Sequence, residues 1–169
     1  MERCYLLFGS NMGDKDQLFA DACTLINNRC GRVMEVSAAY ESEPWGFEAD
    51  EWFLNRVIAV DTELEPETML QQLLEIEAEL GRVRHPNQEG YASRPIDLDI
   101  LYFGERVILS DRLTVPHPRL HLRRFTLVPL CELIPDFLHP VLHKTQSELL
   151  EECHDALEVR KRLVYQPEE

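Results

Sequence analysis

The order of its apolar segments constrains the fold of this chain more than any other feature of the sequence. Two stretches have the spacing of amphipathic helices: Ala22 and Ile26 lie on the apolar stripe of the first, and the second opens at Pro66 and directs Leu73 and Leu74 inward. Four other stretches are rich in β-forming residues and read as strands, at residues 5–9, 33–43, 53–64 and 96–103. The predicted order is therefore strand, helix, strand, strand, helix, strand.

An α+β fold accommodates this order. In a ferredoxin-like βαββαβ sandwich, an antiparallel sheet carries both helices on one face. Five prolines between residues 116 and 140 break the remaining chain into a C-terminal extension of short helices and loops, with a helix expected at residues 145–152. Because a length of 169 residues suits one hydrophobic core, residues 1–169 are expected to form a single domain.

Charge and cysteine usage exclude several classes of protein. The formal net charge of −14 argues against binding to nucleic acid or anionic membranes, since both favour basic proteins. No apolar run approaches the roughly 20 residues that span a bilayer, and the first residues lack the pattern of a secretory signal. The five cysteines are an odd number and never form Cys-x-x-Cys, which is typical of free thiols in a cytosolic protein. We therefore expect a cytoplasmic protein without an obligate protein partner.

Basic residues are concentrated in one segment of this acidic chain. Residues 82–124 hold eight Lys or Arg and five Asp or Glu, whereas residues 1–81 hold five and 17. All eight basic residues of the segment are arginines, whose planar guanidinium groups suit phosphate oxygens. The distribution indicates a local anion such as a polyphosphate. The alternative is an arginine-rich face that is only solvated.

Within this segment, Asp97 and Asp99 alternate with Ile96, Leu98 and Ile100. A strand therefore places both carboxylates on one face and the apolar side chains on the other. Two carboxylates at this spacing can hold one or two Mg²⁺ ions, whose coordination is completed by phosphate oxygens. Taken alone, such a pair is more often a solvent-facing feature of a strand. The surrounding arginines favour phosphoryl or pyrophosphoryl transfer instead, because that chemistry depends on positioning and charge neutralisation.

Six motifs follow one another between about residues 4 and 137: Gly9-Ser10-Asn11, Pro44-Trp45-Gly46, Phe53-Leu54-Asn55, Gly81-Arg82-Val83-Arg84, Arg94-Pro95-Ile96-Asp97-Leu98-Asp99-Ile100 and Arg112-Leu113-Thr114-Val115-Pro116-His117. Together they resemble the 6-hydroxymethyl-7,8-dihydropterin pyrophosphokinase family of folate biosynthesis. The resemblance implies a ferredoxin-like fold and two Mg²⁺ ions. It also implies that ATP and 6-hydroxymethyl-7,8-dihydropterin are the substrates, and that the β,γ-diphosphate of ATP moves to the hydroxymethyl group with release of AMP.

The resemblance further implies roles for individual residues. Asp97 and Asp99 match the family's magnesium ligands, and Arg82 and Arg94 match two arginines that stabilise the transferring group. Positions that contact ATP are matched by Glu77, Arg84, Arg112, Thr114, His117 and Arg123. Positions around the pterin are matched by Ser42, Glu43, Trp45, Gly46, Phe53, Asn55 and Phe125. In this interpretation the two phenylalanines stack on the ring faces, and the asparagine hydrogen-bonds the ring edge.

Each of these residue types also has a plain structural explanation. Exposed arginines form surface salt bridges, and phenylalanines in strands and helices usually belong to the core. His117 could be a packed loop histidine. Glu77 lies on the apolar stripe of its helix and could form an ion pair with a nearby arginine instead of contacting the nucleotide.

The sequence departs from the family pattern at two places. Residues 89–93 replace a segment that commonly contains tryptophan, so that Tyr91 only partly substitutes for a lid aromatic, and Ser42-Glu43 replaces the more usual Thr-Pro. Residues 44–51 and 84–93 are expected to be loops, the second of them rich in turn formers, and both are predicted to close over the substrates. Two other functions remain open: a generic two-metal nucleotidyl or phosphoryl transferase, and a regulatory module that binds a nucleotide without turnover.

Overall fold

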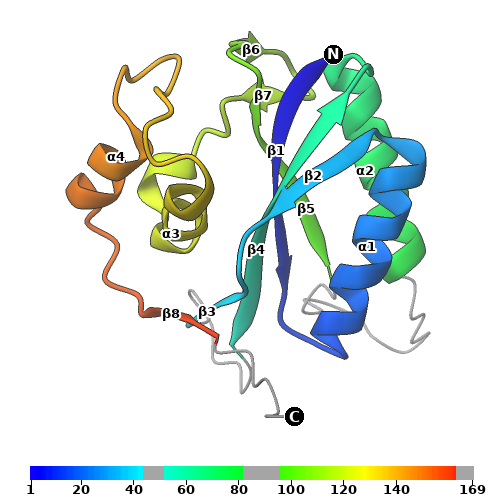
Figure 1. The fold of residues 1–169 in the computed structure, drawn as a ribbon, viewed down its shortest axis with the longest axis horizontal. Coiled ribbons are helices and arrows are strands. Elements are labelled where there is room, and N and C mark those ends of the chain that lie inside the picture. The colour runs from blue at the N-terminus through cyan, green and yellow to red at the C-terminus, as the bar shows by residue number, and fades with distance from the viewer. Residues whose placement is uncertain (44–51, 82–95, 163–169) are drawn as a thin grey trace.

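The computed structural model describes residues 1–43, 52–81 and 96–162, and its centre is one antiparallel β-sheet (Figure 1). The strands of this sheet are β1 (Glu2–Ser10), β2 (Arg32–Val36), β3 (Tyr40–Ser42), β4 (Phe53–Thr62), β5 (Asp97–Phe103) and β8 (Val159–Lys161). The four predicted strand regions are all present. The region predicted at residues 33–43 is divided into β2 and β3, both of which pair with β4.

Strand order follows β5, β1, β4, β3 and β8, with β2 beside β3 on the same edge of β4. Helix α1 (Lys15–Arg29) therefore connects β1 to β2 across β4, and helix α2 (Pro66–Gly81) connects β4 to β5 across β1. Neighbouring strands are antiparallel throughout the sheet. This split βαβ arrangement is that of the ferredoxin-like sandwich, and it confirms the fold class predicted from the order of the elements.

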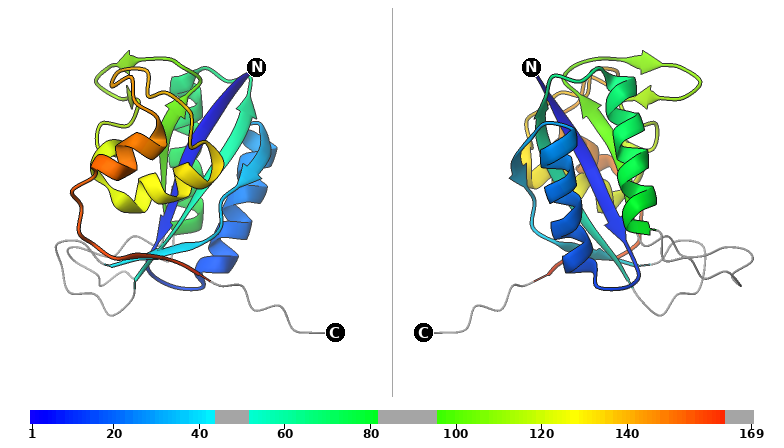
Figure 2. Two further views of the ribbon diagram at one scale, coloured as in Figure 1. Left: turned by 60° about the vertical axis from the view of Figure 1, so that its left-hand side comes forward. Right: turned by 90° about the vertical axis from the view of Figure 1, so that its right-hand side faces the viewer.

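Both helices α1 and α2 cover the first face of the sheet (Figure 2). Asp14 caps α1 by accepting a hydrogen bond from Gln17 N at 3.1 Å. The prediction that Leu74 points inward is wrong, because its side chain is 45% exposed. Met69, Leu73 and Ile76 form the buried stripe of α2 instead.

The second face of the sheet is covered as well, by the part of the chain that follows β5. Here lie the 3₁₀ turn η1 (Leu120–Leu122), helix α3 (Arg124–Leu133) and helix α4 (Gln146–Glu152). Leu127, Leu130 and Leu149 pack against Leu7 and Val57 of the sheet. Because both faces are covered, the middle of β1 is a continuous buried run rather than an alternating one.

The C-terminal extension contains the predicted helix at residues 145–152, and it ends in a strand that the sequence did not predict. Thr145 and Glu148 form a capping box at the start of α4, which confirms the helix expected at residues 145–152. After α4 the chain returns to the sheet, where β8 pairs with β3 and Val159 lies opposite Ser42. A separate two-stranded ribbon joins β6 (Ile108–Leu109) to β7 (Thr114–Val115).

Two expectations about composition can be compared with the structure. All five cysteines lie in the described ranges and are free thiols, as predicted from their number and spacing. Among the described helices, we find none with the length and hydropathy that a membrane crossing needs.

Candidate active site

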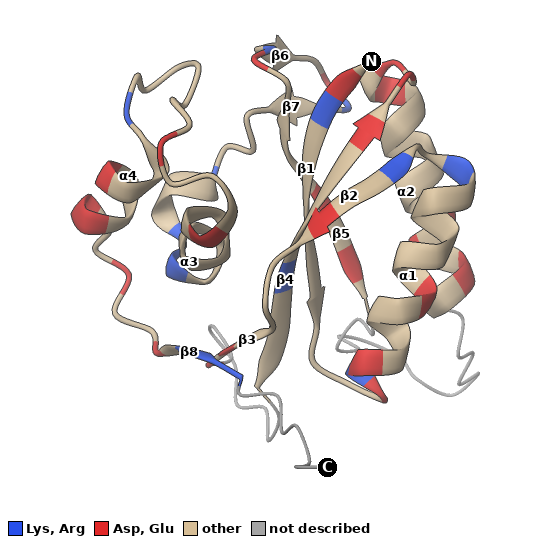
Figure 3. Cartoon of the chain, in the orientation of Figure 1, with Lys and Arg blue, Asp and Glu red and all other residues tan. Residues whose placement is uncertain are grey.

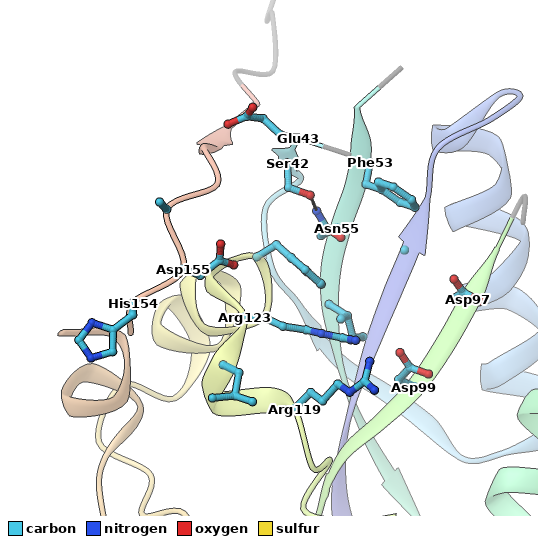
Figure 4. Close-up of a pocket in the computed structure, with 15 residues that line it drawn as sticks. Ser42, Glu43, Phe53, Asn55, Asp97, Asp99, Arg119, Arg123, His154 and Asp155 are labelled. Carbon is cyan, nitrogen blue, oxygen red and sulfur yellow. Dashed lines mark hydrogen bonds between the residues drawn. The ribbon is translucent and has the colours of Figure 1, made fainter. Parts of the chain in front are cut away.

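A cavity of about 700 Å³ lies between the second face of the sheet and the η1–α3 segment (Figure 4). Residues from six separate parts of the chain line it, so that it exists only in the folded protein. Its lining consists of Leu7, Gly9, Ser42, Glu43, Phe53, Asn55, Asp97, Asp99, Arg119, Leu122, Arg123, Phe125, His154, Asp155 and Ala156.

Cross-strand register builds the floor of the cavity. Gly9 of β1 lies opposite Asn55 of β4 on one side and opposite Asp97 of β5 on the other. Leu7 of β1, two residues before Gly9, lies opposite Asp99 of β5. Side chains that are directly opposite in a sheet project from the same face, so that Asn55 and the two aspartates share this floor. Since Gly9 has no side chain, the floor between Asn55 and Asp97 is open.

Asp97 and Asp99 project from the same face of β5, as the alternating sequence predicts (Figure 4). The intervening apolar residues are 3–4% exposed and belong to the core under α1 and α2, at Ile96, Leu98 and Ile100. The two carboxylates fit Mg²⁺, which prefers hard oxygen ligands and usually takes only one or two from the protein. In the described ranges no cluster of three or more His, Cys, Asp or Glu forms a metal site. Substrate oxygens and water can complete the coordination of an ion at Asp97 and Asp99.

Two arginines face these carboxylates from the opposite wall. Arg119 precedes η1 and Arg123 precedes α3, and in Figure 4 both guanidinium groups reach toward β5. Figure 3 shows the same division of charge, with the start of α3 blue and part of β5 red. Burial lowers the pKa of Arg123, while Asp99 acts in the opposite direction by stabilising its charge. The cavity therefore offers cations and carboxylates on opposing walls, an arrangement that suits a metal-bound polyphosphate.

The other end of the cavity is lined by two aromatic rings and a side-chain amide. Phe53 of β4 and Phe125 of α3 line it together with Asn55 and Ser42. Asn55 Nδ2 donates to Ser42 Oγ at 2.8 Å, and this hydrogen bond orients the amide so that Oδ1 lies on the side of Gly9. The carboxylate of Glu43 accepts a hydrogen bond from Glu158 N at 2.7 Å. Flat aromatic surfaces beside a fixed amide suit a planar heterocycle.

Four of the residues predicted to contact ATP lie outside the lining of this cavity. Glu77 Oε2 accepts a hydrogen bond from Leu98 N at 2.7 Å, and Arg112 Nη2 donates to Gln71 Oε1 at 3.2 Å. Thr114 is the first residue of β7. The fourth is His117, whose Nδ1 accepts from Arg119 N at 3.1 Å.

His117 is held in its neutral form. Burial, with smaller effects from Arg123 and Arg119, lowers its pKa to about 4. Because Nδ1 accepts a backbone hydrogen bond, Nε2 carries the single proton of the neutral ring. His117 is therefore a hydrogen-bond donor through Nε2 at neutral pH.

The remaining predicted site residues lie outside the described residues. These are Trp45 and Gly46 of the predicted pterin site, the predicted catalytic arginines Arg82 and Arg94, and the predicted ATP contact Arg84. The two segments predicted to close over the substrates, 44–51 and 84–93 with Tyr91, lie there as well. Their roles stay predictions from the sequence.

Sequence reasoning missed several residues that line the cavity. Arg119 was visible as part of the arginine-rich segment, but no motif assigned it to the site. Leu7 and Leu122 read as ordinary apolar residues. His154, Asp155 and Ala156 follow the last helix and carry no sequence signal that relates them to residues more than 50 positions earlier.

A ferredoxin-like sheet that presents paired carboxylates opposite arginines has the chemistry that phosphoryl-transfer enzymes require. Comparison with known families narrows this class. The family 7,8-dihydro-6-hydroxymethylpterin-pyrophosphokinase (HPPK) matches residues 5–135. The chain belongs to this family, which confirms the resemblance that the motifs indicated.

Named relatives agree with this assignment. The chain is 42% identical to the 2-amino-4-hydroxy-6-hydroxymethyldihydropteridine pyrophosphokinase of Porphyromonas gingivalis, over 80% of this chain and 92% of that protein. It is also 42% identical to the enzyme of the same name from Methylorubrum extorquens, over 82% of this chain and 86% of that protein. It is 37% identical to the folic acid synthesis protein fol1 of Pneumocystis carinii, over 91% of this chain but only 20% of that protein.

Solved structures show the same fold. HPPK-DHPS of Plasmodium falciparum with SDX-DHP superposes with a TM-score of 0.72 at 19% identity, covering 90% of this chain. The chain spans 43% of that longer protein. The likeness therefore supports the fold of this chain and does not extend to the rest of the longer one.

Proposed function

We infer that the cavity on the second face of the sheet is where this chain performs its reaction. As a member of the pyrophosphokinase family, the chain transfers the β,γ-diphosphate of ATP to the hydroxymethyl group of 6-hydroxymethyl-7,8-dihydropterin in folate biosynthesis, giving AMP and the pterin diphosphate. One observation carries the location: a single cavity contains a carboxylate pair at one end and an aromatic and amide cluster at the other.

The aromatic end is proposed to bind the pterin. Phe53 and Phe125 come from different layers of the fold, so that a flat ring between them would be stacked on both faces. Asn55 offers an oriented amide to the polar edge of the ring, because its Nδ2 group is already held by Ser42. The Glu43 carboxylate is held by its hydrogen bond from Glu158 N, and we assign Glu43 and Ser42 to the rim of this pocket. The sequence motif places Trp45 and Gly46 in the same proposed site.

The carboxylate end is proposed to bind the phosphates of ATP. Asp97 and Asp99 would hold the Mg²⁺, for which we propose two ions. When bound, Mg²⁺ neutralises phosphate charge and makes the phosphorus more electrophilic. Arg123 and Arg119 face the same space, and their guanidinium groups would orient the phosphate oxygens by charge-assisted hydrogen bonds. The stacked pterin at the opposite end of the cavity would direct its hydroxymethyl group toward these phosphates.

The remaining roles rest on the matched motifs. Arg82 and Arg94 are proposed to stabilise the charge on the transferring group, and Arg84 is proposed to bind ATP with Glu77, Arg112, Thr114 and His117. The neutral His117 would contribute an Nε2 proton to an oxygen of the nucleotide, since its Nδ1 is occupied. Glu77 braces β5 through Leu98 N, so that it could act on the site by positioning the strand that carries the aspartates.

Product analysis tests the proposed function against its rivals. The protein is incubated with ATP, Mg²⁺ and 6-hydroxymethyl-7,8-dihydropterin, and the nucleotides are separated by chromatography. We expect one AMP for each pterin consumed, and no AMP when the pterin is omitted. ADP as the product would indicate ordinary kinase chemistry, and unchanged ATP would indicate a module that only binds nucleotide. Either result would contradict the proposal.

A further inference from the structure

The segment that follows α4 forms part of the cavity wall. His154, Asp155 and Ala156 line the cavity, although they lie beyond residues 5–135, the part of the chain that matches the family. Figure 4 shows Asp155 and His154 on the side of the cavity opposite β5, next to the start of α3. The chain therefore completes its active-site cavity with residues that the family comparison does not cover.

Asp155 makes two hydrogen bonds that connect this segment to α3. Its Oδ2 accepts from Arg124 N at 3.1 Å, and its Oδ1 accepts from Leu157 N at 3.0 Å. Arg124 is the first residue of α3, and Arg123, at the N-cap position, makes no side-chain capping bond. The first backbone N–H groups of a helix have no partner within the helix. Asp155, which lies 31 positions further along the chain, therefore caps the start of α3, a role that a residue next to the helix has in most proteins.

The start of α3 is also where two site residues are held. Arg123 precedes the helix and Phe125 is its second residue, and both line the cavity. The capped N–H of Arg124 lies between them in the sequence. We propose that Asp155 is a positioning residue for the pyrophosphokinase reaction, which fixes the start of α3 and thereby the placement of Phe125 against the pterin and of Arg123 against the phosphates. This inference rests on the proposed function of the cavity.

The far end of the same segment is anchored to the pterin side of the sheet. Glu158 N donates to Glu43 Oε1 at 2.7 Å, and Glu43 N donates to Glu158 O at 3.3 Å. Strand β8 then continues into the pairing with β3. Asp155 thus links α3 to a segment that is itself fixed to the β3 edge of the cavity. Because this segment is anchored at both ends, a shift of Asp155 would also move the start of α3, where Phe125 lies.

The charge of Asp155 has a second effect at the same place. A carboxylate at a helix N-terminus is favourable because the end of the helix carries partial positive charge. Asp155 also stabilises the charged form of Arg123, opposing the effect of burial on its pKa. An amide at position 155 would retain one acceptor atom and lose this charge, which separates the two contributions.

Two variants of Asp155 and one control test the proposal. Asp155→Ala removes both acceptors, and Asp155→Asn keeps one. Thr145→Ala is the matched control, because Thr145 caps α4 by accepting from Glu148 N at 3.2 Å and does not line the cavity. The measurements are kcat, the KM values for pterin and ATP, the midpoint of thermal unfolding, and equilibrium binding of the pterin in the presence of a non-hydrolysable ATP analogue.

We expect Asp155→Ala to raise both KM and the dissociation constant for the pterin about tenfold, since hydrogen bonds to a charged acceptor are among the stronger ones. Asp155→Asn should raise them about threefold. Thr145→Ala should lower the unfolding midpoint and leave both constants within twofold of the wild type. If Asp155→Ala fails to fold, the Asn variant carries the comparison.

Unchanged pterin constants in both Asp155 variants would overturn the proposal, as would an equal loss of pterin affinity in Thr145→Ala. The wild-type enzyme separates this outcome from the proposed function. A wild type that forms no AMP contradicts the function itself, whereas an active wild type with unaffected Asp155 variants contradicts only the positioning role.

Discussion

At the scale of single residues, the alternation around Asp97 and Asp99 does two tasks at once. Its apolar members fill the core under α1 and α2, and its acidic members line the cavity on the other face. Burial of the strand depends on the apolar members, so that replacement of either carboxylate leaves the core under α1 and α2 unchanged. Stability and activity should therefore respond differently to substitution at these two aspartates.

We expect Asp97→Ala or Asp99→Ala to lower kcat by about 10³-fold or more, because the loss of a metal ligand removes several kcal/mol of charge stabilisation. The midpoint of thermal unfolding should stay the same or rise slightly. Steady-state kinetics at saturating Mg²⁺ and a thermal melt measure the two effects. Asp111→Ala, an exposed acidic residue outside the cavity lining, should change neither. Near-native turnover by either aspartate variant would contradict their assignment as metal ligands.

At the scale of elements, the joint between α1 and β2 sets how the helix layer lies on the sheet. Thr62 Oγ1 of β4 donates to Cys30 O at the end of α1 at 2.6 Å. At the next residue, Gly31, an added Cβ would be 2.2 Å from Asp61 O and 3.0 Å from Thr62 Cα. Both neighbours are backbone atoms and cannot move away by a change of rotamer. The close approach of the helix end to β4 therefore requires glycine.

Gly31→Ala should lower the free energy of unfolding by about 2 kcal/mol or more, because the new methyl group overlaps backbone atoms. Gly9→Ala is a useful comparison, since a Cβ there would lie 3.8 Å from Asn55 Oδ1, an ordinary contact. That variant should stay within about 1 kcal/mol of the wild type and yet bind the pterin less well, because its methyl group enters the floor of the cavity. Urea unfolding and pterin titration measure both. Equal stability of the two variants would contradict the steric argument at Gly31.

At the scale of the whole molecule, two histidines are held neutral in or beside the layer on the second face. His139 accepts hydrogen bonds at Nδ1 from Val141 N at 3.1 Å and Leu142 N at 3.0 Å. Burial, with smaller effects from His121 and His143, lowers its pKa to about 4. His117 has a pKa lowered to about the same value, also mainly by burial. The fold therefore opposes protonation at two separate sites.

Because the folded protein disfavours the protonated forms of His117 and His139, we expect it to lose stability in mild acid. Between pH 6.5 and about 4 the unfolded chain binds protons at both histidines and the folded chain does not, so that the free energy of unfolding falls as the pH is lowered. Above pH 6.5 the two histidines contribute no slope. His139→Asn keeps an acceptor near the position of Nδ1 and should flatten the slope in this window. Chemical denaturation at several pH values tests it, and the same slope in the variant and the wild type would contradict the prediction.

Local patterns were enough to predict the order of the strands and helices of the sandwich and the carboxylate pair of the site. Strand and helix order and the helix at residues 145–152 depend on neighbours in the sequence, and so does the shared face of Asp97 and Asp99. The inward direction predicted for Leu74 failed because the stripe of α2 is centred on Met69, Leu73 and Ile76. The motif resemblance supplied what periodicity could not, namely the grouping of Phe53, Asn55 and Phe125, which the cavity contains.

The sequence by itself therefore determined the fold class, the family and the carboxylate pair, because each follows from short-range spacing and motifs. Only the tertiary structure decided that the C-terminal part covers the second face, that β8 joins the sheet, and that Asp155 caps α3. These contacts join positions tens of residues apart, and their energies come from burial and from backbone groups that any sequence possesses. No local pattern encodes such pairings, since a free N–H of α3 can donate a hydrogen bond to any carboxylate that the rest of the fold brings within reach.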